Sequence, residues 1–152
     1  MAACRAAGIA VEVVPGISAA QGAAARLGVS LTHRRHARRV QYVTGHGEDG
    51  ALPRDFDWRS VVDPATTTAV YMPAKTIAGF MQRAIAAGLD PATPAAAIAC
   101  AARADEVKIV TTAAALPGQL AHGPQRGPVL VIIGRVLADA ADASSAQRRT
   151  AA

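Results

Sequence analysis

Residues 11–20, VEVVPGISAA, form the first of four segments whose residue types could do chemistry. An apolar strand over residues 11–14 leads into a Pro15-Gly16 turn, and Ser18 is placed to cap a helix that ends near Leu27. In an α/β fold, this arrangement presents free helix amides at the carboxyl edge of the sheet, where ligands tend to bind. The same arrangement is often purely structural, so a binding role and a structural role both stay open for this segment.

The second segment, SLTHRRHARR at residues 30–39, is rich in arginine. The chain has 16 Lys+Arg against 11 Asp+Glu, a formal net charge of +5. The whole excess lies within residues 13–47, which contain five arginines and no acid. These arginines are Arg26, Arg34, Arg35, Arg38 and Arg39.

Arginine side chains bind carboxylates or phosphates through two parallel hydrogen bonds, so this cluster is a candidate anion site. The chain has one Trp, two Tyr and two Phe, and none of them interleaves with the arginines. A nucleic acid would therefore find no aromatic side chains on which to stack its bases, and we expect no nucleic-acid partner. A solvated basic face remains the alternative to an anion site.

The third segment, YVTGHG at residues 42–47, carries His46 in a glycine-rich turn after a strand. The acids that follow, at positions 48, 49, 55 and 57, match no calcium-loop spacing and have no second histidine nearby. We therefore predict no metal site. A hydrogen-bonding role within the turn explains His46 better than a ligand role does.

The fourth segment, AVYMPAK at residues 69–75, places Met72 at the carboxyl end of a strand. A methionine there usually packs in the core. Its polarizable thioether can also line an apolar ligand pocket. The sequence alone leaves both positions open for Met72.

These segments need a scaffold, and the chain alternates short apolar runs with alanine-rich helical stretches separated by Gly or Pro. This alternation predicts an α/β fold, a layered sheet with helices on both faces. Strands are expected at residues 11–14, 40–44, 67–72, 94–101, 106–111 and 129–134, and helices at residues 18–27, 75–87 and 113–121. Residues 1–138 are expected to form one folded domain, residues 139–152 a flexible tail, and residues 45–65 the longest irregular stretch.

Composition excludes several classes of protein. A length of 152 residues suits one domain with a sizeable core. Cys4 and Cys100 lie far apart without a CxxC partner, which argues against a disulfide framework or a zinc site and favours a reducing, cytoplasmic setting. Arg5 and Glu12 interrupt the apolar start, so we predict no signal peptide. No apolar run approaches the ~18 residues of a membrane helix, so we expect no membrane partner.

In their order and spacing, VVPGISAA, LTHR, YVTGHG and VYM, followed by GPVLVIIGRV, resemble uroporphyrinogen-III C-methyltransferases of the tetrapyrrole methylase family. These enzymes act in siroheme and cobalamin synthesis. The resemblance runs from about residue 3 to residue 138 and corresponds to the C-terminal part of such an enzyme. It implies the C-terminal α/β domain of the tetrapyrrole methylase fold.

The family's N-terminal domain carries a GPG turn, a GGDP-type cofactor loop, and the Asp and Lys assigned to proton transfer, and this sequence has none of these. We therefore expect the N-terminal domain to be absent, through either truncation or a mis-started or broken gene. No catalytic residue is expected within the chain. On its own it should be a poor or inactive enzyme.

The resemblance also implies roles residue by residue. Ser18, Ala19, Met72 and Ala101 match positions that contact the methyl donor, S-adenosylmethionine, and Arg34 matches an arginine that faces substrate carboxylates. The implied reaction methylates C2 and C7 of uroporphyrinogen III to give precorrin-2. This sequence departs from the family at Ala99-Cys100, where the family has Glu-Asn, and at Pro73, where it often has Gly.

The implied partners are the tetrapyrrole substrate, a second copy in a homodimer, and the missing N-terminal domain. Two alternatives stay open beside the uroporphyrinogen-III methyltransferase. One is a catalytically inactive binding or assembly module that pairs with a separate N-terminal partner or with itself. The other is a methylase of a different tetrapyrrole, such as a precorrin.

Overall fold

The computed structural model describes residues 1–123, 127–138 and 140. Among these residues, five strands form one sheet in the order β1-β2-β5-β3-β4. The strands are β1 Arg39–Thr44, β2 Thr66–Tyr71, β3 Pro94–Ala99, β4 Val107–Thr112 and β5 Val129–Ile133. The helices are α1 Ala2–Ala6, α2 Ala19–Leu27, α3 Trp58–Val62, α4 Ile77–Ala86 and α5 Leu116–Ala121, with a 3₁₀ turn, η1, at Arg135–Leu137.

The centre of the sheet is β5, whose VLVII sequence is buried along its whole length. It pairs antiparallel with β2 on one side and with β3 on the other, so that Val131 faces Val70 and Ala97. β1 pairs parallel with β2, and β4 antiparallel with β3. An uninterrupted apolar run is typical of a strand that is covered on both faces, as β5 is.

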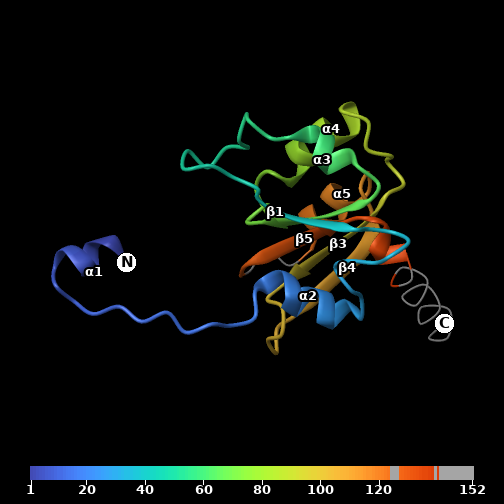
Figure 1. The fold of residues 1–152 in the computed structure, drawn as a ribbon. Coiled ribbons are helices and arrows are strands. Elements are labelled where there is room, and N and C mark those ends of the chain that lie inside the picture. The colour runs from blue at the N-terminus through green and yellow to red at the C-terminus, as the bar shows by residue number, and fades with distance from the viewer. Residues whose placement is uncertain (124–126, 139, 141–152) are drawn as a thin grey trace.

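Helices cover both faces of the sheet, which confirms the predicted α/β class (Figure 1). On one face α3, α4 and α5 pack over a core that includes Phe80, Met81 and Leu116. On the other face α2 and η1 pack over a second core, in which Ala20 and Ala23 of α2 lie in one cluster with sheet residues such as Ile132. Alanines on the buried side of α2 allow its backbone to approach the sheet closely.

Local signals placed most elements within about two residues of their observed ends. The Ser18 cap is confirmed: its hydroxyl accepts from the Gln21 amide at 3.4 Å, and the Gln21 side chain accepts from the Ser18 amide at 3.0 Å. The two side chains also hydrogen-bond each other. This reciprocal capping box fixes the start of α2 next to the sheet edge.

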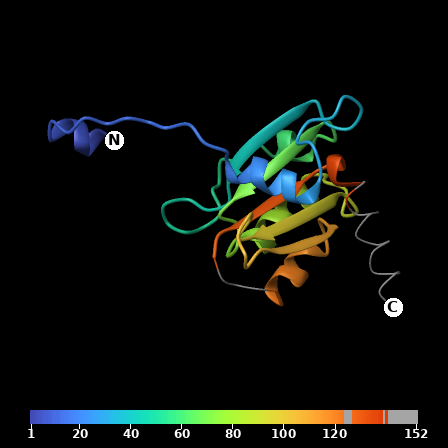
Figure 2. The ribbon, with the colours of Figure 1, turned by 90° about the horizontal axis from the view of Figure 1, so that it is seen from below.

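The strand predicted at residues 11–14 is wrong. Residues 7–18 form an extended arm that leads from α1 to α2 and stands away from the body of the molecule (Figures 1 and 2). Val14 is 80% and Ile17 is 85% exposed. Within the described residues, the backbone of residues 10–17 makes no hydrogen bond. A strand forms only when a neighbouring strand pairs with its amides and carbonyls, and the described sheet offers the arm no such neighbour.

The stretch at residues 45–65 is also less irregular than predicted, because it contains α3. Trp58, at the first position of α3, packs against Phe56 and Phe80 with ring centroids 5.2 and 5.3 Å away. This aromatic contact stabilises a helix too short to be stable alone. The predicted tail at residues 139–152 lies outside the described residues, except for Ala140.

Two further features are absent from the described residues. No helix there combines the length and the apolar character that crossing a bilayer requires. The same residues contain no group of three or more His, Cys, Asp or Glu side chains arranged to hold a metal ion.

Candidate functional site

A cavity of about 530 Å³ opens at one edge of the sheet. The carboxyl ends of β1, β2 and β3 meet there with the first residues of β4 and β5. The start of α2 forms part of its wall. Its lining includes Ala19, His46, Tyr71, Met72, Cys100 and Ala101.

Three residues predicted from the resemblance line this one cavity, although they are far apart in the sequence. Ala19 opens α2, Met72 follows β2, and Ala101 follows β3. Ser18 is adjacent but does not line the cavity, and its hydroxyl takes part in the capping box. The structure thus brings the predicted cofactor residues together. Their contact with a cofactor stays a prediction.

Met72 belongs to the cavity and not to the core. Its side chain is 54% exposed, and its backbone φ of 53° lies in the left-handed region. Cys100 and Ala102, after β3, have φ values of 51° and 62°. Backbone strain of this kind collects at ligand sites, and two of the three strained residues, Met72 and Cys100, line the cavity.

At the start of α2, the backbone amide of a cavity-lining residue is free in the described part of the chain. The Gln21 amide donates to Ser18, and the Ala20 amide donates to the Tyr71 hydroxyl at 3.2 Å. Within the described residues, the Ala19 amide has no acceptor. Free amides at a helix start carry partial positive charge and bind carboxylates or other acceptors.

The glycine-rich turn after β1 is joined to the loop after β2. Gly45 donates its amide to the Tyr71 carbonyl at 2.6 Å and accepts from the Thr76 hydroxyl at 2.5 Å. A Cβ atom at Gly45 would lie 2.7 Å from Cα of Pro73, so only glycine allows this approach. The chain therefore needs glycine here to hold the turn against the cavity wall.

This turn positions His46, whose Nδ1 lies 3.1 Å from the Met72 carbonyl. A carbonyl oxygen only accepts, so Nδ1 is the donor of this hydrogen bond. His46 and Lys75 both line the cavity. Neither was among the site residues predicted by resemblance, although the glycine-rich turn had already drawn attention to His46.

The turn from β3 to β4 forms another part of the wall. Burial, together with a hydrogen bond to Asp105, raises the pKa of the Cys100 thiol, which therefore stays protonated. The Ala102 amide donates to Glu106 at 2.7 Å and, with Arg26, lowers the pKa of that carboxyl. Both acids are thus used in structural contacts.

The polar character of the cavity is cationic. None of its described lining residues is acidic, whereas Lys75 and Arg103 lie along it. Most of the remaining lining is apolar side chain or backbone. Such a cavity suits a ligand with an apolar body and an acceptor or anionic group, which could meet Lys75 or the free Ala19 amide.

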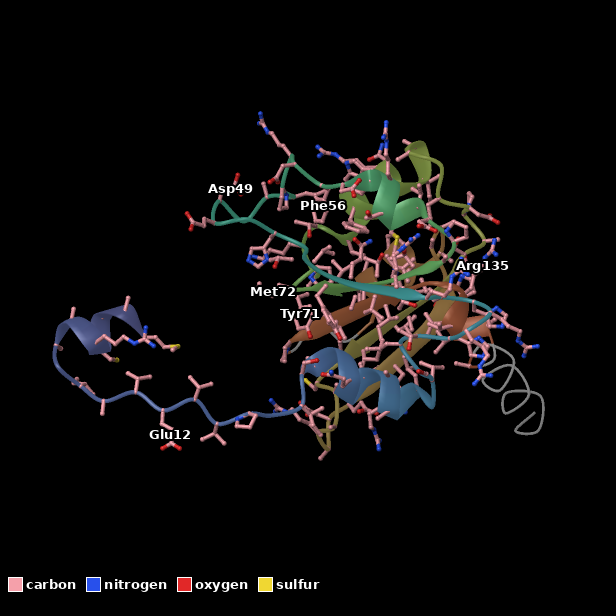
Figure 3. The ribbon with its side chains drawn as sticks, in the orientation of Figure 1. Glu12, Asp49, Phe56, Tyr71, Met72 and Arg135 are labelled. Carbon is pink, nitrogen blue, oxygen red and sulfur yellow. The ribbon has the colours of Figure 1, made fainter. Side chains whose placement is uncertain are left out.

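Arg34 lies elsewhere. It is exposed in a small hairpin closed by His33 and Ala37, immediately before β1. The Arg39 amide at the start of β1 bonds the Ala65 carbonyl before β2, so this hairpin lies at the end of the sheet opposite to the cavity. Six residues of β1 separate the two ends, roughly 17 Å at strand spacing. In Figure 3, Met72 at the cavity end of β2 and Arg135 just after β5 mark these two opposite ends of the sheet.

Comparison with known proteins supplies a family. The family model described as Tetrapyrrole (Corrin/Porphyrin) Methylases matches residues 1–117. The matched range includes the arm, β1, β2, β3 and β4, and hence most of the cavity wall.

Individual relatives agree with this match. A siroheme synthase of Chromobacterium violaceum is 43% identical over 143 residues, covering 94% of this chain and 30% of that protein. A uroporphyrinogen-III C-methyltransferase of Paracoccus denitrificans is 41% identical over 142 residues, covering 93% of this chain and 49% of that protein. This chain therefore spans half or less of the length of these relatives.

Solved structures give the same result. The uroporphyrin-III C-methyltransferase of Thermus thermophilus, solved in complex with S-adenyl homocysteine, superimposes with a TM-score of 0.71 at 26% identity. The superposition covers 88% of this chain and 57% of that chain. The observed sheet and its helices therefore have the fold of part of a methyltransferase.

Proposed function

This chain belongs to the tetrapyrrole (corrin/porphyrin) methylases, and on that premise we propose that its cavity binds S-adenosylmethionine, the methyl donor of a tetrapyrrole methylation. The observation that carries the proposal is the meeting of Ala19, Met72 and Ala101 in one cavity. An apolar lining with a few polar groups is typical of small-molecule sites. The Thermus relative, solved with S-adenyl homocysteine, supports this class of ligand.

The proposed reaction moves one methyl group from a sulfonium sulfur to C2 and another, from a second cofactor molecule, to C7 of uroporphyrinogen III, giving precorrin-2. In each transfer the carbon–sulfur bond breaks as a carbon–carbon bond forms, and the macrocycle loses a proton. Catalysis of such a displacement is mainly positioning in a cleft that excludes water. The named relatives support uroporphyrinogen III as the substrate. A precorrin is the alternative within the same chemistry.

We further propose that residues 1–138 act as the C-terminal α/β domain of a two-domain enzyme. The cavity opens at the sheet edge and leaves a bound cofactor uncovered on one side. An N-terminal methylase domain would supply the second wall and the proton-transfer residues, and the active form would be a homodimer. The isolated chain then binds the cofactor weakly and does not methylate.

The cofactor proposal can be tested on the ¹⁵N-labelled chain by titration with S-adenosylhomocysteine up to millimolar concentration. Chemical shifts of Ala19, Met72 and Ala101 should move, and those of the Arg34 hairpin should not. Ala101→Trp fills the cavity and should weaken binding at least tenfold, whereas Ala104→Trp, in the same turn but outside the cavity lining, should not. No shifts in the parent chain, or equal binding by the two variants, would refute the proposal.

Arg34 is proposed to bind a substrate carboxylate at a distance from the cavity. A charge-assisted hydrogen bond contributes about 1.5–3 kcal/mol, or roughly tenfold or more in affinity. Because of the roughly 17 Å separation, such a contact requires a substrate that extends along β1 or an arginine from a second copy.

Binding of uroporphyrin III, a stable octacarboxylate, should fall about tenfold or more in Arg34→Ala. Arg34→Lys should restore it poorly because the two-pronged hydrogen bond is lost. Arg35→Ala is the neighbouring control, and unchanged binding in both Arg34 variants would remove Arg34 from the proposal.

One observation favours a second function, that of an assembly module without catalysis. The arm exposes a row of apolar side chains, Ile9, Val11, Val13, Val14 and Ile17. Exposed apolar patches of this kind mark interaction surfaces. Sedimentation of the chain should show association that depends on concentration, and the double substitution Val13→Glu with Val14→Glu should abolish it. A monomer at all concentrations, with cofactor binding intact, would exclude self-association through the arm.

A further inference from the structure

The Tyr71 hydroxyl links the sheet to the first turn of α2. It accepts a hydrogen bond from the Ala20 amide at 3.2 Å, across 51 residues of sequence. Ala20 is completely buried, so its amide has no access to water and depends on this partner. A single side-chain oxygen thus satisfies the buried amide that follows Ala19.

Tyr71 is itself held firmly in place. It is the last residue of β2, paired with Thr44 of β1 and with Leu130 of β5. Its carbonyl accepts from the Gly45 amide, and its ring lies edge-on to the ring of Tyr42 at 6.2 Å. The hydroxyl therefore has a fixed position relative to the cavity that Tyr71, Ala19 and Met72 line together. Figure 3 labels Tyr71 and Met72, which follow each other at the end of β2.

The start of α2 needs such a fixed point. The residues before it belong to the exposed arm, and the helix face on the sheet consists of the small side chains Ala20, Ala23 and Ala24. The last turn is held separately. The Arg26 side chain donates a hydrogen bond to the Glu106 carboxylate at 2.9 Å, and the Arg26 carbonyl accepts one from the Lys108 ammonium. At the first turn, the side chain that joins α2 to the sheet by a hydrogen bond within the described residues is that of Tyr71.

We propose that Tyr71 is a positioning residue for the cofactor: its hydroxyl holds the first turn of α2 so that the free Ala19 amide faces the cofactor's amino-acid carboxylate. The inference rests on the proposed function. The carboxylate is the matching group because a helix start attracts anions and no acidic residue lines the described part of the cavity. Tyr71 acts through α2, and its removal should affect ligands that carry this carboxylate.

The test compares two ligands and two variants. S-adenosylhomocysteine carries the carboxylate, and 5′-methylthioadenosine keeps the adenosine and the thioether but lacks it. Tyr71→Phe keeps the ring and should weaken binding of the first ligand about three- to tenfold, the effect of one hydrogen bond, with 5′-methylthioadenosine unchanged. Tyr42→Phe is the control, because its hydroxyl makes no hydrogen bond within the described residues.

Amide hydrogen exchange separates positioning from general loss of structure. In Tyr71→Phe the Ala20 amide should exchange several-fold faster, while Leu27, near the Arg26 anchor, keeps its protection. Equal weakening of both ligands, no weakening of either, or loss of protection along all of α2 would each overturn the inference. If the unsubstituted chain bound neither ligand, the proposed function would fail instead.

Discussion

Two apolar runs of this chain have similar residue types, but one forms a buried strand and the other lies exposed outside the sheet. VLVII at residues 129–133 forms β5, the central strand, and Ile132 is completely buried. VEVV at residues 11–14 lies in the arm, and Val13 is 68% exposed. Both runs are rich in β-branched residues, which favour strands. Strand propensity is therefore common to both segments, and the presence of partners decides between them.

The partners can be named for β5 and are missing for the arm. Val131 of β5 stands between Val70 and Ala97 on the neighbouring strands. In the described structure residues 10–17 have no backbone hydrogen bond at all. An apolar run therefore becomes a strand only where neighbouring strands pair with it. Mutations in the two runs should differ in their effects for the same reason.

The largest difference is expected for one residue type in the two settings. Ile132→Ala removes a completely buried side chain and should lower the free energy of unfolding by about 2–5 kcal/mol. Ile17→Ala removes a side chain that is 85% exposed and should change it by less than about 0.5 kcal/mol. Urea unfolding followed by circular dichroism measures both. A loss above about 1 kcal/mol in Ile17→Ala would mean that the arm packs on the body in solution.

Glycines next to the two runs provide the second comparison. Gly134 follows β5 with φ of 148°, and a Cβ there would lie 3.3 Å from the Thr66 carbonyl oxygen. Gly134→Ala should therefore lower stability by about 1–3 kcal/mol through backbone strain and crowding. At Gly16 a Cβ would meet nothing within 4 Å, and Gly16→Ala should have almost no effect. Thermal unfolding of the two variants would contradict this view if their midpoints were equal.

This contrast also explains how much of the fold the sequence could predict. Ser18, the apolar face of α4 and the VLVII run were sufficient to predict α2, α4 and β5. Caps, helix faces and buried apolar runs depend only on residues within one turn or one strand. The strand predicted at residues 11–14 was wrong because a strand also needs a pairing partner from another part of the chain, which the local sequence does not reveal. α3 was missed because its stability comes from Trp58 against Phe80, a contact across 22 residues of sequence that no local pattern contains.

The candidate site divides in the same way. Ala19, Met72 and Ala101 could be named from motif positions, and the topology places all three on one cavity. The hydrogen bond from Ala20 to Tyr71 could not be foreseen, because it depends on how α2 crosses the sheet. Arg34 could also be named from a motif, but it lies far from the cavity. A motif match alone therefore does not show that a residue belongs to this site.

The third comparison is within β2, the neighbour of β5. Thr68 accepts from the Gln41 side chain at 2.7 Å, whereas the Thr67 hydroxyl is buried without a partner among the described residues. Thr68→Val should lower the free energy of unfolding by about 1 kcal/mol. Thr67→Val should leave it equal or raise it, since an unpaired buried hydroxyl is removed. A loss in Thr67→Val as large as in Thr68→Val would contradict the view that the Thr67 hydroxyl is unpaired.

The smallest effect is expected when most of the arm is removed. Deletion of residues 1–16 leaves Ile17 and the Ser18 capping box in place, and residues 10–17 contribute no backbone hydrogen bond to the described body. The free energy of unfolding should therefore change by less than about 0.5 kcal/mol. Ser18→Ala, which removes the cap of α2, should lower it by about 0.5–2 kcal/mol and shows that the assay can detect a small loss. If the deletion lowered stability as much as Ser18→Ala, the arm would contribute to the fold, and the contrast with β5 would be one of degree.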